Sequence, residues 1–177
     1  MSSRAAHLTI PVSDRDHATG PLSAPLVLVE YGDYQCPHCG TAYPVLKQLR
    51  AAFGAALTFV FRNFPLTSVH AHAQRAAETA EWAGLAGRFW DMHDHLYAHQ
   101  DRLDDRGLRA AATALGLDPG ALQAAWDGHA LIPRVKEDLR GGIQSGVTGT
   151  PRLFLNGARY DGPVGVDALT AALEAAR

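Results

Sequence analysis

The sequence is poor in cysteine and has no long apolar run. Only Cys36 and Cys39 carry thiols among its 177 residues, so a single intrachain pair is all that can form. The longest apolar stretches, such as 26–29 and 57–61, are far shorter than the roughly 20 residues that a bilayer-spanning helix requires. No insertion into a membrane is therefore expected.

An excess of charge of one sign is also missing. The chain has 16 basic and 18 acidic residues, a formal net charge of -2, and the basic residues are spread along the sequence. This pattern argues against a nucleic-acid partner, which requires clustered positive charge. Neither a glycine-rich dinucleotide motif nor a phosphate loop occurs, so no cofactor is predicted and electrons must come from another protein or a small thiol.

The N-terminal stretch, residues 1–12, lacks the features of an export signal. Arg4 and His7 are present, but there is no apolar core of about 7–15 residues and no convincing small-residue cleavage site. We therefore expect a cytoplasmic protein. Since the cytosol keeps thiols reduced, a disulfide between the two cysteines would be transient and catalytic there.

The spacing of apolar residues predicts one α/β domain. Hydrophobic residues make up 47% of the chain, enough for a sizeable core at this length. A strand, a helix and a second strand come first, and the two strands should be parallel. Helical spacing then continues to residue 146 as an insertion, and Asn156-Gly157 marks a hairpin. The expected elements are strands 7–12 (a short edge strand), 26–31, 57–63, 153–155 and 158–160, and helices 36–53, 71–85, 88–99, 104–115, 118–127, 131–145 and 166–176.

One expected helix of the insertion carries an apolar stripe. Leu131, Val135, Leu139 and Ile143 recur with helical spacing. We expect this stripe to pack in the core.

Cys36-Pro37-His38-Cys39 follows the strand at 26–31 and begins a helix. The thiolate is the attacking species in disulfide exchange, and an ordinary cysteine with a pKa near 8.5 is only about 3% ionised at pH 7. Free backbone N–H groups and the dipole at a helix N-terminus favour the charged sulfur of Cys36, which is the predicted nucleophile. Cys39, one turn later and shielded by the helix, is predicted to resolve the mixed disulfide.

The two residues between the cysteines support this chemistry. Pro37 lacks an N–H group that the first helical turn would leave unpaired. His38 adds a hydrogen-bond donor, or a positive charge when protonated, beside the sulfur. Both should stabilise the reduced form and make the disulfide more oxidising.

The alternative interpretation of the two cysteines is half of a structural zinc site. Tetrahedral zinc needs two more ligands, which would have to be histidines. The pairs 70/72 and 95/99 are available, but no CxxC and HxxxH arrangement lies within zinc-finger spacing. Redox chemistry is the favoured hypothesis, and no metal is predicted.

Glu30 stands in the apolar strand before the cysteines. It shares a strand face with Leu26 and Leu28, in a strand expected to be central and covered on both sides. An unpaired carboxylate is costly there and its pKa should rise, so Glu30 could take up and return the proton of Cys39. The alternative is a salt-bridged or strand-end carboxylate.

These features together resemble the DsbA family of thioredoxin-fold thiol:disulfide oxidoreductases. The resemblance rests on the CPHC motif, on Glu30 six residues before Cys36, on Gly149-Thr150-Pro151 ahead of a hairpin, and on the helical insertion. It covers nearly the whole chain. Further segments resemble the DsbA-type domains found free in bacterial cells or fused to sodium-proton antiporters: 16–17, 29–33, 63–66 and 89–94.

The resemblance implies a thioredoxin fold with a helical insertion. The thioredoxin-like part would comprise 25–66 and 147–177, the insertion 67–146, and an N-terminal strand and loop 1–24. It also implies that Pro151 is cis and faces the cysteines, with Thr150 hydrogen-bonding an extended substrate. The lysine that exported members tend to have near the buried carboxylate is missing. Arg62 is either its substitute or a surface residue.

The predicted function is a thiol:disulfide oxidoreductase that exchanges disulfides with protein or small-thiol substrates, reacting also with an unidentified redox partner. A redox-responsive binding module, whose CxxC state controls association with a partner, is the alternative from a different class. A glutathione-dependent transferase or isomerase is a third hypothesis, against which the intact cysteine pair speaks.

Overall fold

The computed structural model of the chain describes residues 6–177, and the expectations for residues 1–5 lie outside them. Its centre is a five-stranded sheet in the order β1-β3-β2-β4-β5. Strands β2 and β3 are parallel, and the other neighbouring strands are antiparallel. The strands are β1 (His17–Thr19), β2 (Leu26–Gly32), β3 (Leu57–Asn63), β4 (Arg152–Leu155) and β5 (Ala158–Tyr160).

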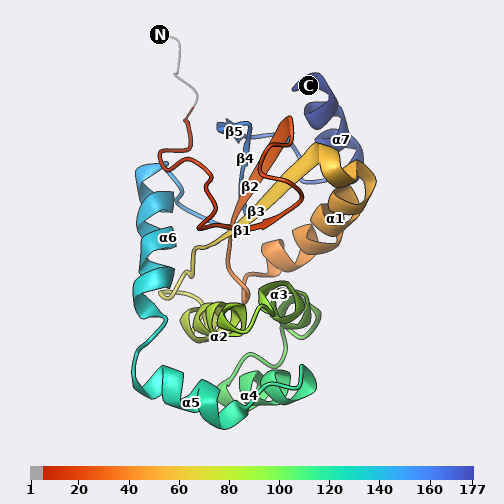
Figure 1. Cartoon of the computed structure of the whole chain (residues 1–177). Coiled ribbons are helices and arrows are strands. Elements are labelled where there is room, and N and C mark those ends of the chain that lie inside the picture. The colour runs from red at the N-terminus through yellow and green to blue at the C-terminus, as the bar shows by residue number, and fades with distance from the viewer. Residues whose placement is uncertain (1–5) are drawn as a thin grey trace.

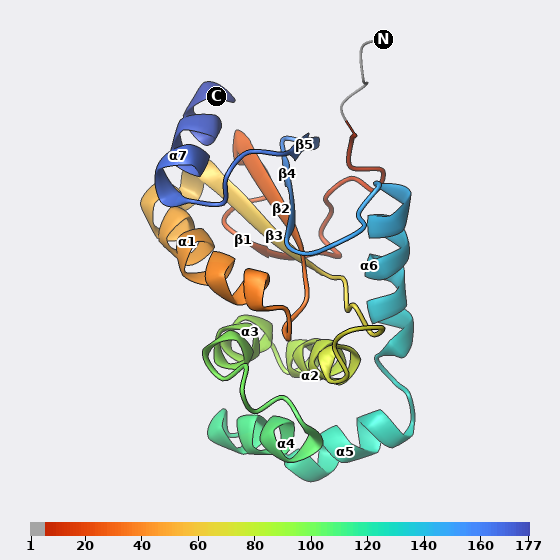
Figure 2. The same ribbon diagram turned by 180° about the vertical axis from the view of Figure 1, so that it is seen from behind.

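Helices cover both faces of the sheet and extend beyond one end. Figure 1 and Figure 2 show α1 and α7 side by side on one face, α6 toward the other, and α2 to α5 beyond the end of β2 that leads into α1. The insertion thus connects β3 to β4, as expected. The helices are α1 (Pro37–Phe53), α2 (Ala73–Leu85), α3 (Phe89–Ala98), α4 (Asp105–Ala114), α5 (Pro119–Asp127), α6 (Ile132–Gln144) and α7 (Val166–Ala175), with a short 3-10 turn at Gly54–Ala56.

Strand β2 separates two hydrophobic cores, because alternate side chains of a strand point to opposite faces. Leu26 and Leu28 belong to the larger core with α1, α2 and α3, whereas Val29 and Tyr31 belong to a smaller core next to α6. The expectation that β2 is central and covered on both sides is confirmed. Its last residue, Gly32, leads directly toward the cysteines.

Local sequence signals set several element boundaries. Asp104 and Asp118 accept hydrogen bonds from the backbone of Gly107 and Gly120, and so cap α4 and α5. Pro44 lies inside α1. At the hairpin, Asn156 and Gly157 have φ values of 46° and 82°, the left-handed conformations that a tight two-residue turn requires.

Two expectations were wrong. Residues 7–12 do not form a strand, since His7 makes only an isolated bridge to Ala158. The edge strand that pairs with β3 is β1, further along the chain. Side chains instead form hydrogen bonds with backbone groups of this stretch: Ser145 accepts from the Thr9 amide, and Arg62 donates to the carbonyls of residues 10 and 11. Ile143 in α6 is 59% exposed, so the buried stripe of that helix ends one turn earlier.

Both interpretations of Arg62 were also wrong. In the parallel register of β2 and β3, Arg62 lies opposite Tyr31, and Glu30 lies opposite Phe61. Arg62 therefore belongs to the other face of the sheet from Glu30, where it is only 3% exposed. Its guanidinium donates to both carboxylate oxygens of Asp16 and to the Tyr31 hydroxyl. It is a buried structural cation that holds the N-terminal segment on β3.

Substitution of Arg62 should therefore destabilise the fold. Arg62→Met keeps most of the side-chain volume but leaves Asp16 buried without its cation, which should lower the free energy of unfolding by roughly 3–5 kcal/mol. Urea denaturation of the variant measures this loss. Arg102→Met, which removes an arginine whose side chain is 72% exposed, is the control and should change stability by less than about 0.5 kcal/mol. Equal losses in the two variants would contradict the structural role.

Candidate active site

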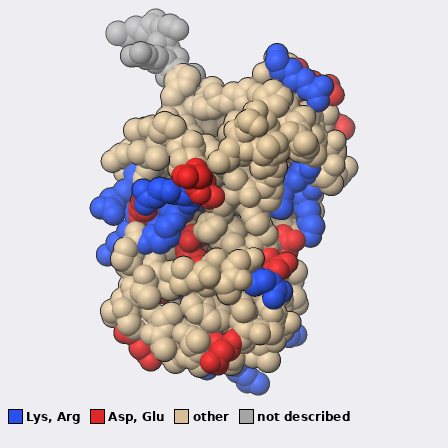
Figure 3. All heavy atoms as spheres, viewed as in Figure 1, with Lys and Arg blue, Asp and Glu red and all other residues tan. Residues whose placement is uncertain are grey.

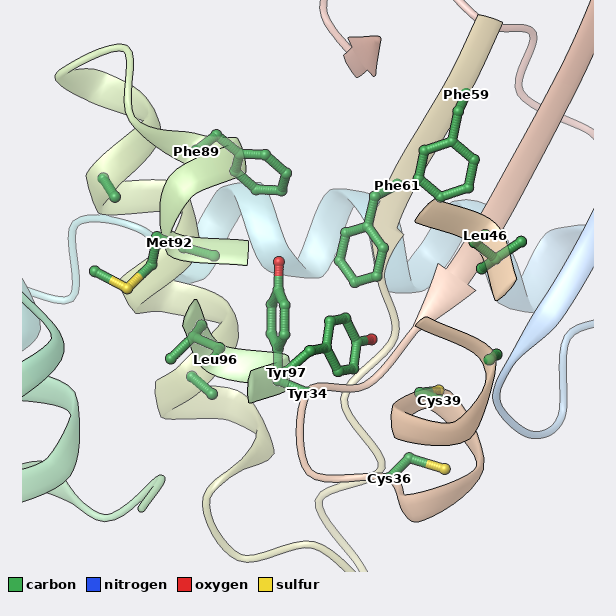
Figure 4. Close-up of a cluster of buried hydrophobic side chains, with 14 of the residues drawn as sticks. Tyr34, Cys36, Cys39, Leu46, Phe59, Phe61, Phe89, Met92, Leu96 and Tyr97 are labelled. Atoms are coloured by element: carbon green, nitrogen blue, oxygen red, sulfur yellow. The ribbon is translucent and has the colours of Figure 1, made fainter. Parts of the chain in front are cut away.

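The two cysteines lie in the first turn of α1, directly beyond the end of β2. Cys36 is the N-cap residue and Pro37 follows as the first helical residue. Both thiols are free, and Figure 4 shows them at the start of α1, with the rings of Tyr34 and Tyr97 on the side toward α3. Cys36 is 3% exposed and Cys39 is 0% exposed. The expected difference in exposure is therefore small, and the two thiols differ instead in their electrostatic surroundings.

The surroundings of Cys36 favour its thiolate. The pKa of Cys36 is lowered to about 5. A hydrogen bond with the Cys39 side chain is the largest cause, Thr150 and the backbone N–H groups of Cys39 and His38 act in the same direction, and burial opposes them. Cys36 is thus ionised at neutral pH, as a nucleophile in disulfide exchange requires.

Cys39 has the opposite character. Burial raises the pKa of its thiol far above the ordinary value, and its hydrogen bond to Cys36 and the nearby Glu30 carboxylate raise it further. The single hydrogen bond between the thiols therefore lowers one pKa and raises the other. Cys39 keeps its proton until something removes it.

Glu30 lies in the middle of β2 with its side chain toward α1. It is 2% exposed, and its Oε1 atom has no hydrogen-bond partner among residues 6–177. Burial raises the pKa of this carboxyl to about 8; Arg50 lowers it, and the charge of Cys36 raises it. Of the two interpretations of Glu30, the geometry matches the buried carboxyl: no salt bridge to it occurs within the described residues.

The segment before β4 borders the nucleophile. The Thr150–Pro151 peptide bond is cis. In its protonated form the Cys36 thiol donates to the carbonyl oxygen of Thr150 across 3.5 Å. The Thr150 hydroxyl is buried without a hydrogen-bond partner among residues 6–177. Residues 114 positions apart in the sequence thus meet at one sulfur atom.

Pro37 and His38 occupy the open side of the site. Both are exposed. Pro37 stands where a missing N–H group costs nothing. The His38 backbone N–H contributes to the low pKa of Cys36, whereas its imidazole makes no hydrogen bond within the described part of the chain.

Sequence reasoning missed several residues that shape the site. Asp33 is 1% exposed and builds the turn between β2 and α1: its carboxylate accepts from the amides of Gln35 and Leu66 and pairs with the His70 imidazole at 2.7 Å. An Asp directly after a buried strand and just before a helix is a recognisable turn signal. Its partner His70 has no signal in the sequence.

Helix α3 and the loop after it also reach the site. The Tyr97 hydroxyl is buried without a partner among residues 6–177 and approaches β2 at Gly32, where a Cβ atom would lie 3.0 Å from it. Gln100 hydrogen-bonds the backbone of Tyr34 and Cys36. Arg50 is the cation whose charge lowers the pKa of Glu30. A groove of about 620 Å³ opens beside Gln100 and is lined also by Gln35 and His72.

Two pairs of histidines were considered as metal ligands, 70/72 and 95/99. His70 pairs with Asp33, and the rings of His95 and His99 stack with their centroids 4.1 Å apart. Within residues 6–177, no three His, Cys, Asp or Glu side chains come together as a metal-binding group.

Charges of both signs are distributed over the face seen in Figure 3, with wide uncharged areas between them. None of the helices in residues 6–177 is both long and apolar enough to cross a membrane.

A CxxC pair at the start of the first main helix, next to a central parallel strand and a helical insertion between β3 and β4, defines a thioredoxin fold of the DsbA type. BdbD from Bacillus subtilis, in its oxidised form, superposes with a TM-score of 0.85 over 97% of this chain and 96% of its own, at 20% identity. A thioredoxin-like oxidoreductase from Silicibacter pomeroyi DSS-3 superposes with a TM-score of 0.82 over 93% and 94%, at 24% identity. These similarities establish the fold.

The chain belongs to the DsbA-like thioredoxin domain family, whose model matches residues 27–174. It is 44% identical over 96% of its length to the Na(+)/H(+) antiporter NhaA 1 of Salinispora arenicola, and 42% identical over 96% to NhaA 3 of Salinispora tropica. It spans only about a quarter, 26%, of the length of these relatives.

The raised pKa of Glu30 predicts a pH-dependent stability difference. Between about pH 5 and pH 8 the folded protein keeps a carboxyl proton that the unfolded chain loses, so wild-type stability falls as pH rises through this window. Glu30→Gln does not titrate. Relative to wild type, the variant should gain roughly 4 kcal/mol in free energy of unfolding from pH 5 to pH 9.

Urea denaturation at a series of pH values measures this gain. Glu174→Gln, at an exposed position in α7, is the control and should follow wild type at every pH. A constant difference between Glu30→Gln and wild type from pH 5 to pH 9 would show that the carboxyl has an ordinary pKa.

Proposed function

We propose that this domain is a thiol:disulfide oxidoreductase that exchanges disulfides with protein or small-thiol substrates. The proposal is carried by one arrangement: Cys36 is the N-cap of α1 and Cys39 is fully buried one turn later, so the pKa values of the two thiols shift in opposite directions. One sulfur is ready to attack at neutral pH, and the other is held as a thiol. Membership of the DsbA-like family supports this division of roles.

In the direction of substrate reduction, the Cys36 thiolate attacks a sulfur of the substrate disulfide. A Cys36–substrate bond forms, the substrate S–S bond breaks, and the first substrate sulfur leaves as a thiolate. Cys39 then loses its proton and attacks Cys36, which releases the second substrate thiolate and leaves the Cys36–Cys39 disulfide. Two electrons have passed from the cysteine pair to the substrate, and a reducing partner must then supply two electrons to the Cys36–Cys39 disulfide.

Glu30 is the proposed proton acceptor for Cys39. The negative charge of Cys36 is one of the causes of the high pKa of Glu30, and this charge disappears when Cys36 enters the mixed disulfide. The pKa of Glu30 should then fall, so the carboxyl ionises at the step where Cys39 must be deprotonated. In the oxidising direction, the neutral carboxyl returns a proton to the Cys39 thiolate.

Thr150 and Pro151 are the proposed substrate-binding residues. The Thr150 carbonyl contacts the Cys36 sulfur, so a substrate chain that brings its own sulfur to Cys36 must pass along this segment. Backbone hydrogen bonding to such an extended chain would be independent of the substrate's sequence.

The names of the relatives favour a second candidate. The chain matches about a quarter of several sodium-proton antiporters, and a redox-responsive module that controls association with a partner suits such a setting. Turnover separates the two functions: an oxidoreductase reduces insulin or oxidises a dithiol peptide many times per molecule, whereas a sensor reacts once.

The direction of electron flow depends on the compartment in which the domain works. In the cytoplasm, the compartment expected from the sequence, the thiol pool keeps the pair reduced and the domain would act on transient disulfides. Equilibration of the Cys36/Cys39 pair with glutathione buffers decides the direction, since about 30 mV corresponds to 1.4 kcal/mol for this couple.

The two cysteine variants should differ in kind. Cys39→Ser should accumulate mixed disulfides between Cys36 and substrate, because no second thiol is left to resolve them. Cys36→Ser should lose nearly all reactivity, because the pKa of Cys39 keeps it protonated at neutral pH. Non-reducing electrophoresis after incubation with a disulfide-containing protein reads out both results. Trapping through Cys39 in the Cys36→Ser protein, with the opposite variant clean, would reverse the roles.

Removal of the His38 imidazole tests whether this exposed ring acts on the nucleophile. His38→Ala should raise the pKa of Cys36 by about 0.5–1 unit and make the disulfide less oxidising, as expected when a group that stabilises the thiolate is lost. Thiolate absorbance followed over pH measures this pKa. His129→Asn, at the far end of the insertion, is the control. An unchanged titration in His38→Ala leaves the imidazole with no electrostatic role.

A further inference from the structure

We propose that Gln100, in the loop between α3 and α4, is a positioning residue for the nucleophile, which it holds by fastening the turn that carries Cys36 to the helical insertion. This inference deepens the proposed function and rests on it for its biological meaning. The expected effect is on the reactivity of the Cys36 thiol, which can be measured without a substrate.

One amide group makes the connection. The Gln100 Nε2 atom donates to the carbonyl oxygen of Tyr34 at 2.8 Å and to that of Cys36 at 3.0 Å. The Cys36 carbonyl also accepts the first backbone bond of α1, from the Gly40 amide at 3.0 Å. Both N–H groups of the side chain are thus used on the two carbonyls that flank the entry into the helix.

Gly40 gives a second, independent observation. A Cβ atom at this position would lie 2.1 Å from the Gln100 Oε1 atom, and no positive φ explains the glycine. Glycine is the least favourable residue for a helix interior apart from proline, by about 1 kcal/mol relative to alanine. A glycine in the first turn of α1 therefore leaves the space in which the Gln100 amide reaches the backbone.

The connection acts on the sulfur through the backbone. The N–H groups of His38 and Cys39 stabilise the Cys36 thiolate, and they can do so only while the first turn of α1 keeps its orientation relative to the Cys36 side chain. Gln100 fixes the carbonyls of two peptide units just before these, Tyr34–Gln35 and Cys36–Pro37. Its hydrogen bonds within residues 6–177 go to these carbonyls and to neither sulfur, so its effect on reactivity is indirect.

Two variants remove the connection from opposite sides. Gln100→Leu keeps the shape of the side chain but has no donors. Gly40→Ala leaves Gln100 in place and displaces its amide. In each variant the rate of Cys36 alkylation by iodoacetamide at pH 4.5 should fall about three- to ten-fold, the change in thiolate fraction for a pKa rise of 0.5–1 unit. The equilibrium with glutathione should shift toward the disulfide by a similar factor.

The Gly40→Ala variant separates positioning from stability. Alanine favours the helix, so its thermal unfolding should occur at or above the wild-type temperature while the thiol becomes less reactive. The double variant Gly40→Ala/Gln100→Leu should lose no more reactivity than either single variant, because both remove the same contact. Gln123→Leu, which removes another side-chain amide of the insertion, is the control and should react like wild type.

Wild-type alkylation rates in both single variants would overturn the inference, as would full additivity in the double variant. Failure of the wild-type protein to turn over insulin or a dithiol peptide would instead refute the proposed function. The alkylation experiment does not depend on that result, so the two failures are distinguishable.

Discussion

The hydrogen bond between the thiols of Cys36 and Cys39 is the interaction on which the chemistry of this domain depends. It stabilises charge on the first sulfur and holds the proton on the second. This asymmetry needs one thiol at the free N–H groups of a helix and the other inside the core, one turn further on. A central strand that ends at the start of α1 supplies both conditions, because it places the helix N-terminus at the edge of the sheet and its first turn over a buried face.

The buried carboxyls show how the site differs from the rest of the molecule. Asp138, in α6, accepts from the amide of Asn63 and pairs with Arg134, and burial raises its pKa only to about 6. Asp33 is likewise surrounded by donors. Glu30 alone of these three has a buried oxygen without a partner, and it is the one next to Cys39. Fixed donors to a carboxylate favour its charged form, so a carboxyl that lacks them keeps its proton more readily in a buried place.

Local patterns predicted most of the fold, because they are encoded over a few neighbouring residues. The apolar runs gave β2 and β3, the CxxC motif gave the start of α1, and Asn156-Gly157 gave the hairpin. Strand β1 was missed because three residues are too few to show an alternation of apolar and polar side chains. Only pairing with β3, about 40 residues away, makes them a strand. Arg62 was misassigned because the face of the sheet on which its side chain lies depends on the register between β2 and β3. Gln100 and Tyr97 reach the site through the packing of the insertion, which no local pattern contains.

The N-terminal and C-terminal segments meet at the end of the sheet remote from the cysteines. Leu8 bonds to Gly157 in the hairpin turn, and Asn156 bonds both to Ala176 and to Val27 at the start of β2. The seven residues of β2 separate this end from the site by about 20 Å. A polypeptide that continued from residue 6 or from residue 177 would therefore leave the described part of the domain at the end of the sheet opposite the cysteines. The edge that carries the sulfur atoms lies away from both of these points.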